Sequence, residues 1–286
     1  MAPTSLSSSA PTSGGSPKAG RNLPAAIAVG VILGGLIVGS LWFHPAAWVA
    51  FYTVAVLIGV GELTRAFAHA KVRVPLVPCL VGTAAIGPAA LVGGPGALLL
   101  VTTACLLGLV LWRSARGLDG AARDVSAGAF VIGYGPFQAA FTALMVAIPG
   151  DGPLRVVTFV LVTVSSDIGG YAVGVLAGKH PMAPSISPKK SWEGFAGSCA
   201  ACVMCGAISV PALLGGAAWA GALFGLVMVV LGTIGDLVES MIKRDLGVKD
   251  LGTILPGHGG LMDRIDSLLV AAPAAWLLLL LMVPPA

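Results

Sequence analysis

The polar residues of this mostly apolar chain gather in two segments whose residue types suit phosphate chemistry. In the later segment, Asp236, Glu239, Ser240 and Lys243 recur at spacings of three and four, so they share one face of a helix. An ion pair within that helix, between Lys243 and one of the acids, would explain this pattern equally well. Carboxylates beside cations are also the arrangement that phosphoryl-group chemistry needs.

The residues that follow this helix favour phosphate chemistry over a simple ion pair. They form the run LPGHGGLMDRID over 255–266, whose glycines let the backbone approach a ligand and expose N–H groups to anionic oxygens, with His258 between them. Asp263 and Asp266 are one helical turn apart, so both can face one site. Mg²⁺ is usually held by one or two carboxylates plus substrate phosphates, so this segment predicts a magnesium site.

The earlier segment carries a second set of charges. Asp167 stands inside an apolar stretch long enough to cross a bilayer, where a carboxylate is costly and indicates a function. Lys189 and Lys190 follow it, and alone they would more often be ordinary cytoplasmic charges. With Asp167 and Glu193 on the same side of the membrane, we interpret the two lysines as phosphate contacts.

Both segments resemble motifs of the phosphatidate cytidylyltransferases, the CDP-diacylglycerol synthases. The later one matches without departure at a serine, a Lys-Arg pair, a Lys-Asp pair, a His-Gly-Gly turn, an Asp-Arg pair and a last aspartate, which are Ser240, Lys243, Arg244, Lys249, Asp250, His258, Gly259, Gly260, Asp263, Arg264 and Asp266. The earlier one, over 166–194, is similar to the family's other polar block, which often has threonine where Ser191 stands. The motifs cover about residues 160–267, and the preceding part matches in hydropathy alone.

The resemblance implies that CTP and phosphatidate react to CDP-diacylglycerol and pyrophosphate, with Mg²⁺ required. An anionic phosphatidate oxygen can attack the α-phosphorus of CTP in line, so catalysis becomes positioning plus charge neutralisation. We expect Asp236 and Asp263 to hold the metal, with Asp266 and Asp167 as further candidates. Because four acids are candidates, the site could also hold a second cation.

The remaining predicted residues contact the phosphates of the two substrates. We expect Lys243, Arg244 and His258 to act beside the metal-binding aspartates. Further substrate contacts are expected from one segment or the other, at Ser187, Lys189, Lys190, Ser240, Lys249, Asp250, Gly259, Gly260 and Arg264.

The elements that must position these residues are membrane-spanning helices. Of the 286 residues 57% are hydrophobic and 10% are charged, whereas soluble domains carry about 25% charged residues. We predict an all-α, polytopic integral membrane protein. Residues 1–22 form a cytoplasmic tail too polar to fold, and residues 23–286 form the transmembrane catalytic domain. The net charge of +4 gives no reason to expect a nucleic-acid partner.

About nine spans are expected at ~20 apolar residues per crossing. They fall near 24–43, 46–63, 75–93, 96–112, 127–148, 154–177, 195–215, 217–238 and 266–284. Connections rich in Lys and Arg alternate with connections whose only such residue is Arg155, so the amino terminus and both motif segments are expected in the cytoplasm. This predicts a multi-pass protein of the cell membrane, with its site where phosphatidate and cytosolic CTP meet.

Other functions explain parts of the pattern. An ion-coupled transporter also has intramembrane acids, but it predicts acids spread through the membrane depth and inverted repeats, and the sequence shows neither. Polyprenol or dolichol kinases and archaeal lipid cytidylyltransferases also use CTP on membrane lipids, and polar residues do not reveal the lipid tail. A purely structural scaffold would have no use for so many charges near lipid.

Two features indicate packing rather than chemistry. Cys199, Cys202 and Cys205 have helical spacing but lack nearby His or carboxylate partners, so we expect buried thiols and neither a metal site nor disulfides. Spans rich in small residues favour close helix packing and, with it, a homodimer.

Overall fold

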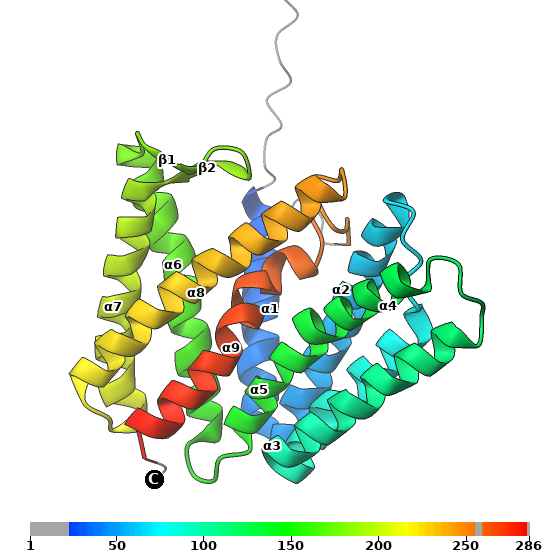
Figure 1. The fold of residues 1–286 in the computed structure, drawn as a ribbon. Helices are drawn as coiled ribbons and strands as arrows, with labels where there is room; N and C mark the ends of the chain where they lie inside the picture. Colours follow the sequence, from blue (N-terminus) through cyan, green and yellow to red (C-terminus); the bar gives the residue numbers. More distant parts are fainter. Residues whose placement is uncertain (1–22, 255–258, 285–286) are drawn as a thin grey trace, which may run out of the picture.

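The computed structural model describes residues 23–254 and 259–284, and this part of the chain is mostly helical (Figure 1). Seven of its helical segments are long and apolar enough to cross a membrane, which confirms a multi-pass, all-α membrane protein. In chain order the elements are α1 (Leu23–Phe43), α2 (Pro45–His69), α3 (Leu76–Ser114), α4 (Ala121–Ile132), the π-helix η1 (Gly133–Phe137), α5 (Gln138–Val146), α6 (Gly152–Ala177), β1 (Pro181–Ala183), β2 (Ser187–Ser191), α7 (Trp192–Leu214), α8 (Ala218–Asp245) and α9 (Met262–Met282). The predicted tail at 1–22 lies outside the described residues.

Helix α3 is a helical hairpin. Gly94 has non-helical backbone angles, φ 64° and ψ −158°, a conformation that glycine adopts without strain. A Cβ atom built on Gly82 would lie 3.4 Å from the Cβ of Cys105, so the two arms of α3 pack against each other. The predicted spans 75–93 and 96–112 correspond to these arms.

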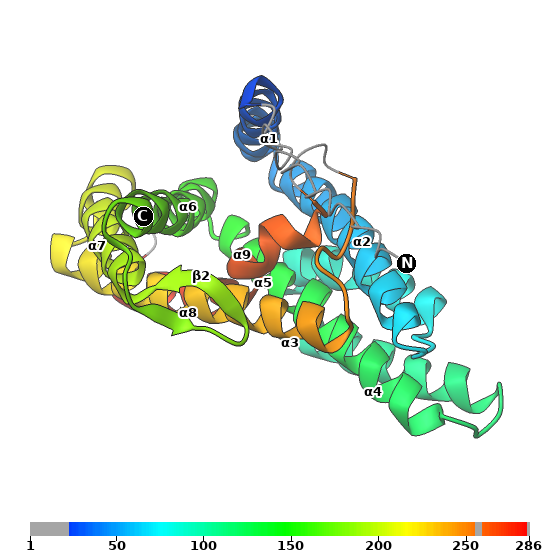
Figure 2. The ribbon, with the colours of Figure 1, turned by 90° about the horizontal axis from the view of Figure 1, so that it is seen from above.

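The helices form two groups with α9 between them (Figure 2). Helices α6, α7 and α8 make one group, α2 to α5 make the other, and α1 packs at the periphery, mainly on α2. Because α9 contacts α2, α5, α6 and α8, it joins the two groups, which also meet directly where α5 contacts α6.

Small residues bring α6, α7 and α8 into close contact. A Cβ atom on Gly169 would lie 2.5 Å from the carbonyl oxygen of Gly197, and one on Gly225 would lie 2.6 Å from the carbonyl carbon of Cys202. Cys202 is fully buried, with Sγ 3.3 Å from the carbonyl oxygen of Val162. These small residues and this thiol therefore serve packing within one chain, and the homodimer stays a prediction.

A short β-hairpin joins α6 to α7, and the sequence did not predict it. Its strands pair antiparallel, with Pro181 opposite Ser191 and Ala183 opposite Ser187. The run SPKKS in β2 lacks the alternation of apolar and polar residues that indicates a strand. The hairpin gives Lys189 and Lys190 a defined position at the end of the bundle.

A buried ion pair fixes the end of the bundle opposite the hairpin (Figure 1). Arg155 near the start of α6 is fully buried and donates to both carboxyl oxygens of Asp151, at 2.7 and 2.8 Å. Its guanidinium also donates to the carbonyls of Leu279 and Val283 at the end of α9, at 2.7 and 2.8 Å. The cation that interrupts the charge asymmetry of the sequence is thus a buried structural residue.

Arg155→Met should lower the free energy of unfolding by about 3–5 kcal/mol, because Asp151 would remain as a buried, unpaired carboxylate. Chemical denaturation of the purified protein in detergent measures this change. Arg116→Met is the matched control, since Arg116 is exposed and lies over the ring of Trp112, a contact worth about 0.5–1 kcal/mol. Equal stability of the two variants would contradict the role given to the ion pair.

Candidate active site

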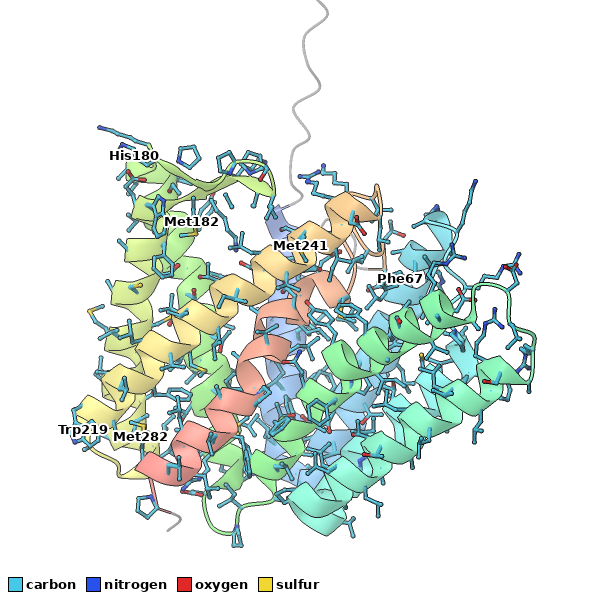
Figure 3. All side chains as sticks on the ribbon, in the orientation of Figure 1. Phe67, His180, Met182, Trp219, Met241 and Met282 are labelled. Carbon is cyan, nitrogen blue, oxygen red and sulfur yellow. The ribbon has the colours of Figure 1, made fainter. Side chains whose placement is uncertain are left out.

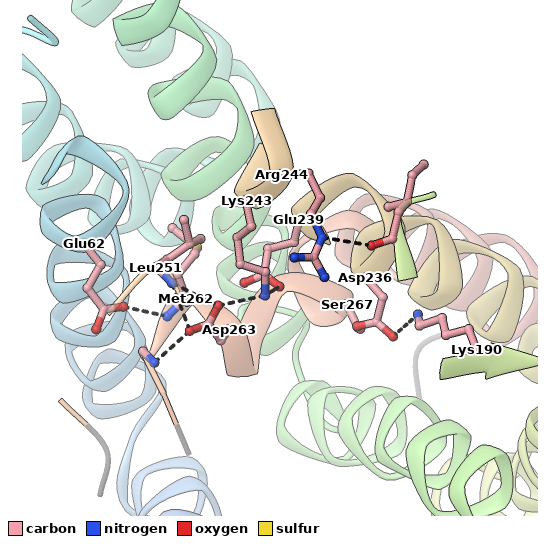
Figure 4. A network of polar contacts seen from close by, with 12 residues as sticks. Glu62, Lys190, Asp236, Glu239, Lys243, Arg244, Leu251, Met262, Asp263 and Ser267 are labelled. Atoms are coloured by element: carbon pink, nitrogen blue, oxygen red, sulfur yellow. Dashed lines mark hydrogen bonds and ion pairs between the residues drawn. The ribbon is translucent and has the colours of Figure 1, made fainter. Parts of the chain in front are cut away.

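The acids of the later motif come together along the seam between α8 and α9 (Figure 4). The two helices run antiparallel, so Asp236 of α8 lies beside Asp266 of α9, and Glu239 lies beside Asp263 one turn further along α8. Helical spacing within each segment was visible in the sequence. The pairing between the two segments is what the structure adds.

The first of these layers, here called the hairpin cluster, consists of Lys190, Asp236, Asp266 and Ser267. The ammonium group of Lys190 on β2 forms an ion pair with Asp236, whose other carboxyl oxygen accepts a hydrogen bond from Ser267 Oγ at 2.8 Å. The side chains of Lys190 and Asp236 are 27% and 31% exposed, whereas Asp266 is 4% exposed. This cluster is therefore anchored on its buried side and open on the other.

The second layer, here called the loop cluster, is almost fully buried. Lys243 Nζ lies 2.6 Å from Glu239 Oε2 and 3.0 Å from Asp263 Oδ1. The carboxyl of Asp263 also accepts hydrogen bonds from the backbone N–H of Gly260 at 2.7 Å and of Leu251 at 3.3 Å. The ion pair within α8 thus exists, but Lys243 also joins α8 to α9.

A hollow lined by both charged and apolar side chains lies between α6, α7, α8 and the hairpin. Gly170 and Gly194 line it where α6 and α7 pack closely, since a Cβ atom on Gly194 would lie 3.2 Å from the carbonyl oxygen of Gly170. Met182 of β1 lines it as well, while His180 lies at the outer edge of the hairpin (Figure 3). Its charged lining comes from both motifs. Asp167, Lys189 and Lys190 belong to the earlier motif, and Asp236 belongs to the later one. The hollow can accept an anionic group beside these lysines.

The other predicted residues lie around these clusters. Arg244 Nε donates to the carbonyl of Ile186 at 3.4 Å, which ties the end of α8 to the hairpin, and Ser187 is half-buried in β2. Ser240 is half-buried on α8, and Gly259 has the left-handed φ of 82°. Four charged residues of this set are exposed, which are Arg244, Lys249, Asp250 and Arg264. His258 lies outside the described residues.

Two residues of the site were not predicted as such. Ser267 directly follows Asp266, and its position next to the last motif aspartate was the available signal. Glu62 lies near the end of the second predicted span, but its hydrogen-bond partner, Met262, is 200 residues away. No spacing rule connects residues that far apart.

The carboxylates fit a magnesium ion held partly by its substrate. Within residues 23–254 and 259–284, no group of three or more His, Cys, Asp or Glu side chains is arranged to hold a metal alone. The adjacent carboxyls of Asp236 and Asp266 still satisfy the usual magnesium arrangement, in which one or two carboxylates are completed by phosphate oxygens and water. One oxygen of Glu239, Oε1, is buried and accepts no hydrogen bond within the same ranges, so acceptor capacity remains in the loop cluster.

Comparison with known proteins shows where the chain belongs. Residues 24–282 match the model of the cytidylyltransferase family. The chain belongs to this family. Proteins from Mycobacterium leprae and Mycobacterium bovis are 43% and 42% identical to it, over 93% of this chain and 90% of their own. One from Brucella suis is 32% identical, over 90% of this chain and 93% of its own. All three are named phosphatidate cytidylyltransferase. The match to the cytidylyltransferase family includes the first helices, which resembled the family only in their hydropathy when the motifs were compared.

Ser267→Ala should reduce the turnover of cytidylyl transfer by about 10-fold or more, because a hydrogen bond to a charged group contributes about 1.5–3 kcal/mol. The lost bond is the one that orients Asp236 toward Lys190. Steady-state rates of nucleotidyl transfer measure this change. Thr103→Ala is the control, since Thr103 bonds only to the carbonyl of Leu99 within the exposed second arm of α3. A Ser267→Ala rate equal to the control's would remove Ser267 from the site.

Proposed function

We propose that this protein transfers the cytidylyl group of CTP to phosphatidate, giving CDP-diacylglycerol and pyrophosphate. The family and the three named relatives support this reaction class. The observation that carries the proposal is the α8–α9 seam, where two layers of acids meet two lysines and where Lys190 and Asp236 of the hairpin cluster line an open hollow. That combination suits two phosphorylated reactants of like charge.

The proposed chemistry needs little from the protein besides position and countercharge. A phosphatidate oxygen, already anionic near neutral pH, forms a bond to the α-phosphorus of CTP. The bond from that phosphorus to the oxygen bridging to the β-phosphate breaks, and pyrophosphate leaves with the electron pair. Lys189, Lys190, Lys243 and Arg244 are the cations we assign to the phosphate oxygens. Lys190 and Lys243 are already held by acids, so their ammonium groups are in place before a substrate arrives.

We assign Mg²⁺ to Asp236 and Asp263, with Asp266 and Asp167 as further ligands and room for a second cation. When bound, the ion would neutralise charge on the phosphate oxygens. The supporting observation is that these acids come together in pairs, with Asp236 beside Asp266 in the hairpin cluster and Asp263 beside Glu239 in the loop cluster.

We further propose nine crossings, counting α1 and each arm of α3 as one, and a location in the cell membrane. The hairpin and the two ends of the connection from α8 to α9 lie at the same end of the bundle as the start of α1, and the end of α9 lies at the other (Figure 1). The positive-inside rule then assigns the site and the amino terminus to the cytoplasm. At that interface CTP arrives from water and phosphatidate from the inner leaflet.

The direct test incubates the purified protein in detergent with labelled CTP, phosphatidate and Mg²⁺. We expect equal amounts of lipid-soluble CDP-diacylglycerol and pyrophosphate. Replacing phosphatidate by a polyprenol separates the kinase alternative, which would release CDP and form a phosphorylated polyprenol. That outcome, or the absence of a nucleotide-bearing lipid with phosphatidate, would refute the proposed substrate.

Asp236→Asn and Asp263→Asn should each reduce turnover at least about 100-fold, because each removes charge that the reacting phosphates and the metal require. Asp119→Asn makes the same change at an exposed acid between α3 and α4 and should leave turnover unchanged. Size-exclusion profiles in detergent establish that the variants are folded. Full activity of Asp236→Asn or Asp263→Asn would exclude that residue from the metal site.

A further inference from the structure

Glu62 on α2 is a buried acid that lies outside both motif segments. It is 1% exposed, and its Oε2 accepts a hydrogen bond from the backbone N–H of Met262 at 3.0 Å (Figure 4). Met262 is the first residue of α9, where the N–H group has no acceptor within the helix. The preceding residue, Leu261, provides no side-chain cap. Glu62 therefore caps α9 from another helix, and its carboxylate suits the positive end of the α9 dipole.

Both ends of the connection between α8 and α9 pass close to this carboxyl group. A Cβ atom on Gly260 would lie 2.7 Å from Glu62 Oε2, and a Cβ atom on Gly252 would overlap the carboxyl group. Gly59, one helical turn before Glu62, lets Met262 lie directly on α2, since a Cβ atom there would be 3.1 Å from Met262 Cε. Glycine at these positions makes room for the contact between α2 and the loop.

The position of Glu62 bears directly on the loop cluster. Met262 immediately precedes Asp263, whose carboxyl accepts a hydrogen bond from Gly260 N–H and contacts Lys243. Within the part of the chain that the structure describes, Glu62 Oε2 accepts a hydrogen bond from the backbone N–H of Met262 at the start of α9, and Glu62 Oε1 accepts none. Glu62 thus contacts the backbone that positions Asp263, and not the side chains of Lys190 or Lys243.

We propose that Glu62 is a positioning residue for cytidylyl transfer: by capping α9 and holding the backbone at Gly252 and Gly260, it sets Asp263 against Lys243. This inference rests on the proposed function. A misplacement of about 1 Å can lower a rate about 100-fold. The lysines of β2 are held by the hairpin instead, so the KM for CTP should depend much less on Glu62.

Three substitutions in α2 separate the role of the acceptor from that of the charge. Glu62→Gln keeps an acceptor oxygen on a side chain of the same size but removes the charge, and Glu62→Leu removes both. Thr64→Val is the matched control, because Thr64 Oγ1 bonds only to the carbonyl of Gly61 within α2. We expect Glu62→Leu to lower kcat about 100-fold with the KM for CTP changed less than about 3-fold. Glu62→Gln should stay within about 5-fold of the wild type, and Thr64→Val should match it.

Hydrogen exchange gives a readout that does not depend on activity. Amides of residues 259–263 should exchange at least about 10-fold faster in Glu62→Leu than in the wild type, because the N–H of Met262 loses its acceptor. Glu62→Gln and Thr64→Val should leave this exchange unchanged. Exchange is measured without substrate, so it tests the helix cap independently of activity. A wild type that forms no CDP-diacylglycerol would refute the proposed function and leave the test of the cap intact.

Either of two results with the Glu62 variants would overturn the positioning role. One is an unchanged kcat in Glu62→Leu. The other is a Glu62→Gln variant with normal exchange that is as inactive as Glu62→Leu, because the charge itself would then act on the substrate. If Glu62→Leu fails to fold, Gly252→Ala provides the test, since its Cβ atom would displace the Glu62 carboxyl. It should lose kcat about 100-fold, whereas Gly108→Ala, which adds a methyl group in open space, should not. Equal rates for these two glycine variants would also overturn the proposal.

Discussion

A carboxylate in a membrane protein needs a cation or a hydrogen-bond donor, and this requirement organises the whole structure. Several acids with little exposure meet a basic partner, and most of the partners come from another element or a neighbouring turn. These pairs are Asp236 with Lys190, Asp263 with Lys243, Asp124 with Arg113 and Asp151 with Arg155. Removing one partner of a fully buried pair, such as Asp151 with Arg155, leaves a charge that the surroundings cannot solvate. The chain therefore closes into a bundle in which the charges fix the ends of the helices and the apolar faces remain free for lipid.

The seam between α8 and α9 combines this requirement with a site. Helix α8 is locked against α7 by contacts between small residues, as at Gly225 and Cys202, so its acids have a rigid support. Helix α9 is shared between the two helix groups, and its first turn depends on the loop backbone and on α2. The hairpin then adds Lys190 from the other side. Helix α9 and the hairpin thus both meet the charged residues of α8, which gives a membrane enzyme a charged site without a large polar core.

Much of this arrangement could be predicted from the sequence, because hydropathy and helical spacing are local signals. The spans, the turn at Gly94 and the shared face of Asp236, Glu239 and Lys243 follow from them, and the family resemblance identified the motif residues. Contacts between distant segments could not be predicted in this way. The pairing of Lys190 with Asp236, rather than of Lys243 with Asp236, depends on how the β-hairpin lies over α8. The β-hairpin itself escaped prediction because its second strand has no apolar alternation.

The central claim is that Lys190 and Lys243, each held by acids along the α8–α9 seam, receive the phosphates of CTP. The most direct measurement is an experimental structure of the protein with Mg²⁺ and a CTP analogue that cannot be cleaved between the α- and β-phosphates. We predict that the triphosphate lies between the two lysines, with the ion against Asp236 or Asp263. A triphosphate bound elsewhere, with both lysine–carboxylate contacts intact, would contradict the account.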